Sequence, residues 1–397
     1  MKVINGRISP PARQLAEVVV PEVSPVLALE TDVSGRGPEP GIALCLSGGG
    51  YRAMLFHLGA LWRLNELGYL SRLDRISSVS GGSITAAVLG SRWSRLSFDG
   101  HGVIRNFEEV ITPIRALAVR TIDVWAALRG MLGPGTIVDQ VVRAYQRHLF
   151  GDATLQDLPN RPRFVINATN LQSGVLWRFM KPYMRDYRVG EVRRPTVLLA
   201  VAVAASAAFP PFLSPVVLRL QEADYTLGSG MDLQQPSYLT RVVLTDGGVY
   251  DNLGLETAWK RYQTVLVSNA GGKMQALSSP GVGWIRQPIR VLSVIDNQVR
   301  SLRSQQVVNS LKNGTRKGAY WGIRTPINEY RAPSLLPCPL EKTSELANVA
   351  TRLGKLGGAL QERLINWGYA VADAAIRSYL DMNLAPPTAF PYPATGV

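Results

Sequence analysis

The sequence predicts an α/β fold in which a mostly parallel β-sheet is covered by helices on both faces. Short apolar runs typical of buried strands alternate along the chain with segments whose apolar residues recur at helical spacing. Two of these strands run directly into a glycine-rich turn and then a helix, over residues 42–64 and again over residues 76–93. This repeated strand, turn and helix is the pattern that predicts the layered sheet.

The first unit starts with the fully apolar run Ile42–Leu46, which is expected to be a central strand. Gly48, Gly49 and Gly50 follow it almost at once. The next segment has apolar residues at helical spacing, namely Met54, Leu55, Leu58, Leu61, Trp62 and Leu64. In the second unit, Ile76–Val79 predicts a strand, residues 80–82 a tight turn, and Ser83–Trp93 a helix.

Four more apolar runs are predicted to be strands: Phe164–Ala168, Val242–Leu244, Val265–Val267 and Val291–Ile295. The chain after Asn297 shows mostly helical patterns, at Val299–Leu311 and Leu346–Leu380. We therefore expect an extension and linker at 1–38, followed by one domain at 39–383. Within this domain the catalytic motifs lie at 44–255 and a helical C-terminal part at 297–383. A proline-rich tail at 384–397 is expected to be disordered or draped on the domain.

The chain of 397 residues is strongly basic, with 43 Lys and Arg against 29 Asp and Glu, a net charge of +14. Such an excess favours anionic partners, whether nucleic acid, an anionic bilayer or phosphate-bearing ligands. No run of consecutive basic residues indicates a nucleic-acid-binding tail. The charge alone does not choose among the three.

Cysteine usage and hydropathy restrict the class of protein further. Cys45 and Cys338 are the only cysteines, too few for a disulfide framework and better interpreted as free thiols in a reducing compartment. The first residues show no apolar signal-peptide core. The longest unbroken apolar segment, Val197–Phe209, is too short to span a bilayer and predicts a buried helix followed by a loop. A soluble or peripheral protein is the expectation.

Ser80 is the candidate nucleophile. It lies in the sequence Ser78-Val79-Ser80-Gly81-Gly82, directly after a predicted strand. A serine on a sharp strand-to-helix turn needs small neighbours, and the usual G-x-S-x-G pattern is met here with Ser78 in place of the first glycine. An ordinary Ser/Gly-rich loop remains an alternative at this point.

The glycine run Gly48-Gly49-Gly50 and the following Arg52 form a second candidate element. Glycines after a strand allow backbone N–H groups to approach a ligand oxygen, which suits an oxyanion hole or a phosphate cradle. The spacing does not match a dinucleotide-binding fingerprint or a Walker loop. Arg52 assists the oxyanion or is a solvated surface arginine.

Asp246 is the candidate base, since Thr245-Asp246-Gly247-Gly248 follows a predicted strand. A structural Asx-turn is the alternative for an isolated D-G-G sequence. Because ligands bind beyond the carboxyl ends of strands in such sheets, Asp246, Ser80 and the glycine run are expected to meet at one edge.

The three histidines, His57, His101 and His148, all precede the candidate aspartate. The Ser-Asp-His order of α/β-hydrolases requires a histidine after the acid, so that triad is excluded. His57 is expected to be a packed core residue. No H-E-x-x-H or paired Cys/His spacing predicts a catalytic metal, and no cofactor is expected.

Taken together, these motifs resemble the patatin-like phospholipase family. The G-G-G-x-R loop, the serine turn about thirty residues later, the segment Ala205–Pro211 and the distant D-G-G occur in the family's order. Ser78 and Ala53 depart from the usual glycines, but both are small. The resemblance implies a three-layer α/β/α sandwich, a catalytic Ser80–Asp246 dyad, and an oxyanion loop formed by residues Gly48, Gly49, Gly50 and Arg52.

The resemblance also implies the activity: metal-independent cleavage of phospholipid acyl esters through an acyl-enzyme. A membrane surface would be the substrate, with the protein in the cytoplasm and peripheral to the inner face of the membrane, a possible homo-oligomer that binds no DNA or RNA. An esterase on soluble esters, and a non-catalytic lipid- or nucleotide-binding member, are the alternatives.

Two further segments carry hypotheses. Val110–Leu132 interleaves apolar residues with arginines, which suits a lid or interfacial helix, or equally an amphipathic helix packed on the core. Some bacterial members of the family are antiphage effectors switched on by a cyclic dinucleotide. That resemblance makes Arg316–Arg331, where arginines and aromatics mix, the candidate activator site, with a plain surface segment as the alternative.

Overall fold

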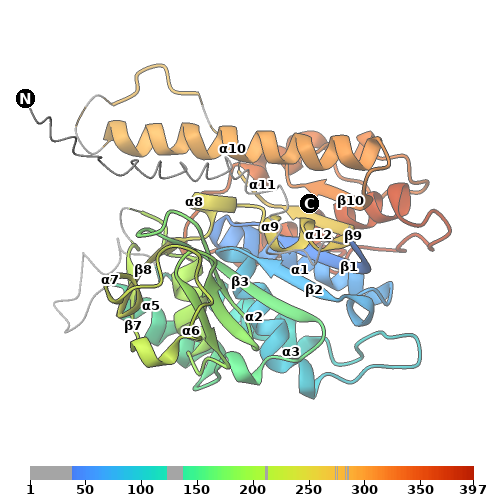
Figure 1. Ribbon diagram of the computed structural model, residues 1–397. Helices are drawn as coiled ribbons and strands as arrows, with labels where there is room; N and C mark the ends of the chain where they lie inside the picture. Colours follow the sequence, from blue (N-terminus) through green and yellow to red (C-terminus); the bar gives the residue numbers. More distant parts are fainter. Residues whose placement is uncertain are drawn as a thin grey trace, which may run out of the picture.

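The computed structural model describes residues 38–122, 137–210, 213–272, 274, 276–281, 283 and 286–397. Within these residues the chain forms one ten-stranded sheet with helices on both sides (Figure 1). The strands are β1 (Glu39–Leu46), β2 (Arg75–Ser78), β3 (Arg163–Asn170), β4 (Leu176–Phe179), β5 (Tyr183–Asp186), β6 (Gly190–Arg193), β7 (Val216–Arg219), β8 (Arg241–Asp246), β9 (Tyr262–Asn269) and β10 (Lys317–Gly322).

The helices range from single turns to long rods. They are α1 (Gly50–Glu66), α2 (Gly81–Arg92), α3 (Glu108–Ala118), α5 (Ile137–Tyr145), α6 (Leu199–Ser206), α7 (Pro236–Leu239), α8 (Gly248–Asp251), α9 (Glu256–Trp259), α10 (Arg286–Lys312), α11 (Leu340–Ala347) and α12 (Gly358–Tyr379). None of the described helices is long and apolar enough to cross a membrane.

Five neighbouring strands, in the order β10-β9-β1-β2-β3, form the parallel centre of the sheet. Beyond β3 the sheet continues as the antiparallel run β4-β5-β6. The α/β class and the parallel centre confirm the prediction. The antiparallel extension is an addition to it.

Strand β8 reaches the sheet from the opposite direction. Its last residue, Asp246, pairs with Ala168 of β3 in antiparallel register, while Ser78 at the end of β2 pairs in parallel register with Ile166 of the same strand. Because β4 occupies the other edge of β3 at both positions, β2 and β8 lie on the same edge and their carboxyl ends point toward each other. This head-on arrangement brings together two chain segments that are about 170 residues apart in sequence.

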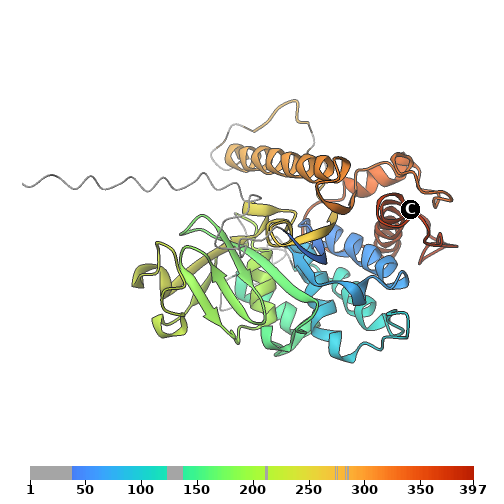
Figure 2. The same cartoon turned by 45° about the vertical axis from the view of Figure 1, so that its right-hand side comes forward.

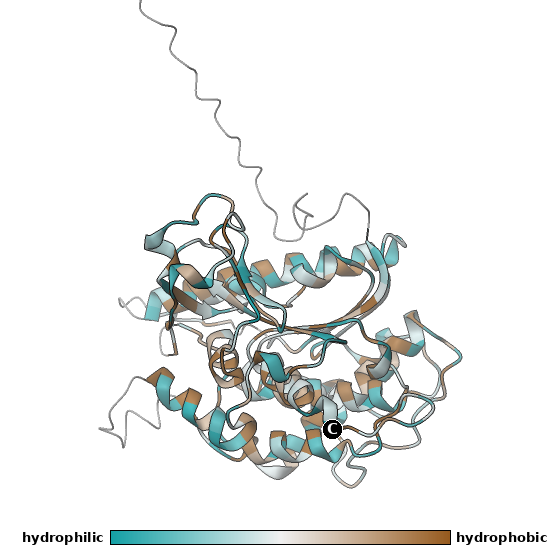
Figure 3. Ribbon diagram, turned by 60° about the horizontal axis from the view of Figure 1, so that its bottom comes forward, coloured by the Kyte–Doolittle hydropathy of each residue, from teal (hydrophilic) through white to brown (hydrophobic). Residues whose placement is uncertain are grey.

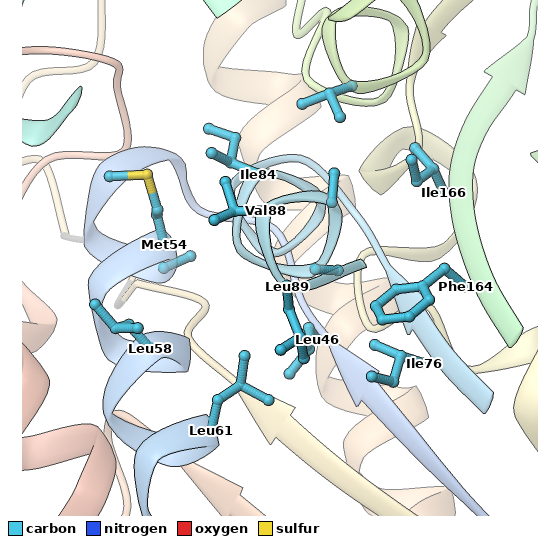
Figure 4. Packing of buried hydrophobic residues seen from close by; sticks show 14 of the residues in the cluster. Leu46, Met54, Leu58, Leu61, Ile76, Ile84, Val88, Leu89, Phe164 and Ile166 are labelled. Carbon is cyan, nitrogen blue, oxygen red and sulfur yellow. The ribbon is translucent and has the colours of Figure 1, made fainter. Parts of the chain in front are cut away.

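The side chains of β1 show why the sheet is covered on both faces. Leu44 and Leu46 enter the larger hydrophobic core, which also contains residues of α1, α2 and α12. Ala43 and Cys45 face the other way, into a smaller core with residues of α9 and with Val307 of α10. In the larger core, apolar side chains of α1 and α2 pack against those of β1, β2 and β3 (Figure 4).

Helices α1 and α12 pack closely because each has a glycine at the contact. A Cβ atom on Gly59 would lie 1.9 Å from the carbonyl oxygen of Ile365, and one on Gly368 would lie 1.9 Å from that of Phe56. Hydrophobic and hydrophilic residues alternate along the covering helices, as expected of helices with one buried face (Figure 3). Helix α6 is almost wholly buried, which confirms the prediction for Val197–Phe209.

Two predictions on secondary structure need correction. Val291–Ile295 is not a strand but part of the long helix α10, because its polar flanks on both sides continue the helical pattern. In Val110–Leu132, residues up to Ala118 belong to α3, whose apolar side chains are buried in the larger core, so this part is not an interfacial helix. Residues 123–136 of that segment lie outside the described residues.

The proline-rich tail is draped on the domain. The Asn366 side chain of α12 donates hydrogen bonds to the carbonyls of Tyr392 and Gly396, at 2.8 and 2.7 Å. The ring of Tyr392 also stacks edge-on against Trp62. Both cysteines are buried and free.

Candidate active site

Ser80 forms a sharp turn between β2 and α2. Its φ of 51° lies in the left-handed region that non-glycine residues seldom adopt. The neighbouring glycines are sterically required, since a Cβ on Gly81 would lie 2.1 Å from the carbonyl oxygen of Gly50 and one on Gly82 would lie 2.5 Å from that of Leu46. The hydroxyl therefore projects at the start of a buried twelve-residue helix, where the backbone amides favour negative charge.

A group of buried hydroxyls supports this turn. The Ser80 N–H donates to Oγ of Ser206 at 3.0 Å, and Oγ of Ser206 lies 2.9 Å from Oγ of Ser83. The Ser83 hydroxyl in turn donates to Oγ of Ser78 at 3.0 Å. Ser78, which departs from the usual glycine, is thus a hydrogen-bonded member of the turn.

Asp246 is brought to Ser80 by the same α6 segment. The Asp246 N–H donates to the carbonyl of Ala208 at 3.0 Å, and the Gly247 N–H donates to that of Ser206 at 3.3 Å. The Asp246 carboxylate accepts a hydrogen bond from the Gly248 N–H at 2.7 Å. It lies near enough to the Ser80 hydroxyl for that group to lower its pKa, and both residues line the same pocket.

Burial makes Asp246 an unusually weak acid. Loss of hydration raises the pKa of its carboxyl from 3.8 to about 7, although the hydrogen bonds from Gly248 and Ser80 oppose that rise. The negative charge of Asp296 on α10 adds to it. A carboxylate with a pKa near neutrality is matched to proton transfer at physiological pH.

The glycine run passes beside Ser80 at the start of α1. Gly49 and Gly50 have φ values of 143° and 60°, which only glycine adopts readily. The N–H of Gly48 donates to the Asn252 carbonyl at 3.0 Å, so that amide is already engaged. The N-terminal ends of α1 and α2 thus converge on one small volume, an arrangement that favours an anion.

Arg52 lies within α1 and is 2% exposed. Its Nε and Nη2 both donate to the Ala270 carbonyl at 3.1 Å, and Nη1 donates to the carbonyl of Val349. These bonds tie the glycine run to two loops that border the site. The arginine is therefore not a solvated surface residue.

His57 fixes the residue just before the glycine run. Its Nε2 lies 2.9 Å from the carbonyl of Ser47, which can only accept, so Nε2 carries the proton and Nδ1 accepts from the Ser268 hydroxyl at 2.8 Å. Burial lowers the pKa of His57 to about 4, so the ring is neutral. Oγ of Ser47 accepts a hydrogen bond from the N–H of Ala270 at 2.8 Å, which also helps to hold the residue before the glycine run in place.

A pocket of about 750 Å³ opens over Ser80, Asp246 and the glycine run. Its remaining walls come from the loop after β9, the first half of α10, and residues 347–353. Apolar side chains include Phe209, Leu213, Met274, Leu277 and Ile289, and charged ones include Arg52, Arg290, Asp296, Arg300 and Arg352. The pocket can hold a long apolar group beside an anionic one.

Sequence reasoning placed Ser80, Asp246 and the glycine run together but missed their supports. Ser206 belongs to the segment Ala205–Pro211 but shows no sign of its contact with Ser80, and Asp296 and Asn252 lie in no motif. His57 was assigned to the core, which is where it lies, but its contact with Ser47 had no sequence signal. In the part of the chain that the structure describes, no group of three His, Cys, Asp or Glu residues could hold a metal ion.

Replacing Ser206 with alanine tests the hydroxyl support. The buried Ser80 N–H would lose its acceptor, which should lower the free energy of unfolding by about 1–3 kcal/mol. The misplaced nucleophile should reduce kcat, while KM for a soluble ester stays nearly unchanged. Urea unfolding and steady-state kinetics measure both effects, with Ser91→Ala at a half-buried position of α2 as the control.

A family model described as patatin-like phospholipase matches residues 44–259. A patatin-like phospholipase domain-containing protein of Coccidioides immitis is 27% identical over 188 residues, which cover 46% of this chain and 23% of the relative. One from Aspergillus niger is 28% identical over 193 residues, covering 47% and 23%. The matched region thus spans about a quarter of the length of these relatives.

Solved structures give more distant matches. Human GIVD cytosolic phospholipase A2 has a TM-score of 0.48 and 14% identity, over 86% of this chain and 62% of that one. VipD from Legionella pneumophila has a TM-score of 0.30 and 16% identity, over 79% and 66%.

Proposed function

The chain belongs to the patatin-like phospholipase family, and from this premise we propose that it is a serine acyl hydrolase that cleaves acyl esters of phospholipids. The observation that carries the proposal is the meeting of β2 and β8 along one edge of β3, which brings Ser80 and the buried carboxylate of Asp246 to one pocket. Burial raises the pKa of that carboxyl to about 7. This pair supplies a nucleophile and a base without a histidine.

In the proposed reaction, Oγ of Ser80 attacks the ester carbonyl carbon and its proton moves to Asp246. The amides of Gly49 and Gly50, at the start of α1, stabilise the oxyanion of the tetrahedral intermediate. The alcohol leaves with the proton from Asp246, and an acyl-Ser80 ester remains. Water, deprotonated by Asp246, then attacks the acyl carbon, and Asp246 returns the proton to Oγ of Ser80 as the bond between that oxygen and the acyl group breaks and the fatty acid leaves. The residues present supply every proton transfer in these steps.

The charge of the pocket supports a phosphate-bearing substrate. Arg300 is 6% exposed and lines the pocket with Arg52, Arg290 and Arg352. Burial is the largest cause that lowers the pKa of Arg52 to about 10, and repulsion from the positive charges of Arg300 and Arg324 adds to it. A bound phosphodiester would offset this repulsion, whereas a neutral acylglycerol would not.

The direct test measures hydrolysis of three substrates by the purified protein. They are phospholipid vesicles, diacylglycerol dispersed without detergent, and a short-chain nitrophenyl ester. We expect hydrolysis of the vesicles and slower hydrolysis of the other two. A protein that hydrolyses only the soluble ester would be an esterase, and one that hydrolyses none would be a non-catalytic member of the family.

We also expect the charge of the vesicle to matter. With a net charge of +14, the protein should hydrolyse anionic vesicles at least about fivefold faster than neutral ones at low salt, since each basic residue near such a surface contributes about 1 kcal/mol. Added salt should reduce the difference. Equal rates on both kinds of vesicle at low salt would contradict this prediction. Binding to the inner face of the membrane from the cytoplasm belongs to the same proposal.

Activation by a cyclic dinucleotide, and with it an antiphage role, gains no support from the candidate segment. Trp321 and Tyr330 are buried in the larger core, and Tyr320 donates its hydroxyl toward Ser304 of α10. Arg324 and Arg331, in contrast, are exposed. The aromatics therefore serve packing and are not arranged with the arginines as a stacking site for bases.

A further inference from the structure

Helix α10 has an apolar face that points into solvent. Val291, Leu292, Ile295 and Leu302 are 48%, 44%, 53% and 63% exposed. Their spacing of one, four and eleven residues places them on one side of a helix. We call these four residues the outer face of α10. The helix forms the outermost layer of the molecule in both views (Figures 1 and 2).

The opposite side of α10 is polar, which reverses the usual pattern of a surface helix. There Arg290, Ser293, Asp296, Asn297 and Arg300 line the pocket over Ser80. Farther along the helix, Arg303 forms a buried ion pair with Asp251 of α8 and donates to the Tyr250 carbonyl at 2.7 Å. The polar contacts thus hold the first part of α10 in place and Val307 anchors its second part in the smaller core, whereas the four outer-face residues contribute nothing to the described core.

We propose that the outer face of α10 docks on an anionic lipid bilayer. The pocket on the other side of the helix also has exposed apolar side chains in its wall, namely Leu277 and Phe209, which are 53% and 45% exposed. A lipid that enters the pocket over Ser80 would meet these apolar side chains.

Charge favours a bilayer as the occupant. The exposed charged residues of α10 are both basic, Arg286 at its start and Lys312 at its end. Its single acidic residue, Asp296, faces the pocket and not the outer face, so no carboxylate of α10 would repel lipid phosphates. The docking rests on the proposed function in that the bilayer also supplies the substrate, but vesicle binding can be measured without hydrolysis.

The test measures co-sedimentation with vesicles of phosphatidylglycerol and phosphatidylcholine, in a Ser80→Ala background that leaves the lipid intact. Leu292→Ser/Ile295→Ser should reduce binding at least tenfold, and Ile295→Glu alone should do the same through charge repulsion. Leu227→Ser, at a residue that is 95% exposed and does not line the pocket, should bind normally. Thermal unfolding verifies that each variant is folded.

With Ser80 restored, the double variant should keep its kcat/KM on a soluble short-chain ester and lose activity only on vesicles. Unchanged vesicle binding in both outer-face variants would overturn the proposal. A second result would also overturn it: light scattering shows a dimer for the unaltered protein and a monomer for the double variant, while vesicle binding is the same for both. A second copy of the chain would then be the partner that covers this face. If binding depends on the outer face but no ester is hydrolysed, the docking stands and the proposed activity fails.

Discussion

Replacing Ser80 with alanine should reduce ester hydrolysis by about 10⁴-fold or more, because the variant has no nucleophile and the remaining groups stabilise only an oxyanion that does not form. The loss should be equal on vesicles and on a soluble ester. Stability should change little, since the Ser80 N–H keeps its bond to Oγ of Ser206 and alanine adds no atoms to the turn. Initial rates and urea unfolding give the two measurements.

The matched control is Ser91→Ala, a serine-to-alanine change at the far end of the helix that follows Ser80, where the hydroxyl donates to the carbonyl of Val88 and accepts from the neighbouring Arg92, away from the pocket. It should retain normal rates. Residual activity of Ser80→Ala within tenfold of the normal rate would contradict a Ser80 nucleophile and would require a different attacking group.

Replacing Asp246 with asparagine should cause a comparable loss, since the amide cannot accept the Ser80 proton and the two residues act as a unit. Asparagine is nearly isosteric and its side-chain oxygen can still accept the Gly248 N–H. In the unaltered protein, kcat/KM should rise with pH through about 7 as Asp246 ionises. A profile that is flat from pH 5 to 9 would exclude Asp246 as the base.

The same substitution should stabilise the protein at high pH. The folded state holds the Asp246 proton more tightly than the unfolded state does, because the pKa is about 7 when folded against 3.8. The contribution of that proton to the free energy of unfolding is therefore largest below pH 3.8, and it is lost as the pH rises through 7. The full difference corresponds to roughly 4 kcal/mol.

Asparagine has no proton to lose. The free energy of unfolding of Asp246→Asn, compared with that of the unaltered protein, should therefore increase between pH 5 and pH 8. Urea unfolding at these two values, compared with Asp139→Asn on the surface of α5, measures it. An equal difference in stability at both pH values would show that Asp246 does not carry a raised pKa.

Four of the five parallel strands, β1, β2, β3 and β9, could be predicted because each contains a buried apolar run. The fifth, β10, was not predicted, because Lys317–Gly322 mixes a charged residue, glycines and aromatics. The antiparallel strands β4, β5 and β6 could not be predicted either. Each has only four residues, and two of them contain Arg178 or Asp186, which are buried with polar partners. Charged residues in short segments look like loops, and only tertiary contacts make them strands.

Val291–Ile295 shows the opposite error. Five apolar or small residues suit a strand and a helix equally, and here the helix has its apolar side in solvent, so the amphipathic pattern could not be assigned to a core. That incorrect prediction falls on the segment that now forms the outer face of α10.

The Ser80–Asp246 pair could be predicted, but not the way in which the two residues meet. The sequence suggested parallel strands that share a carboxyl edge, whereas β8 is antiparallel to β3. Ser206 and His57 act only through bonds to residues distant in sequence, and a single serine or histidine carries no sign of such a partner. Their roles, like that of the pair itself, stay predictions until the variants are measured.

The meeting of β2 and β8 along one edge of β3 has a consequence for variation in this protein. The two strand ends are separated by the distance from Ile166 to Ala168, about 7 Å along β3. No side chain of β3 takes part in the proposed chemistry, but Asn167 and Thr169 donate hydrogen bonds to the carbonyls of Ser78 and Asp246 and so help to hold both strand ends. Only the apolar positions of β3 are therefore free to change in composition, and its length is fixed. Inserting one residue between these positions would both separate Ser80 from Asp246 and turn the following side chains to the other face. Natural variants of this chain should therefore tolerate apolar substitutions at the apolar positions of β3 but not insertions or deletions.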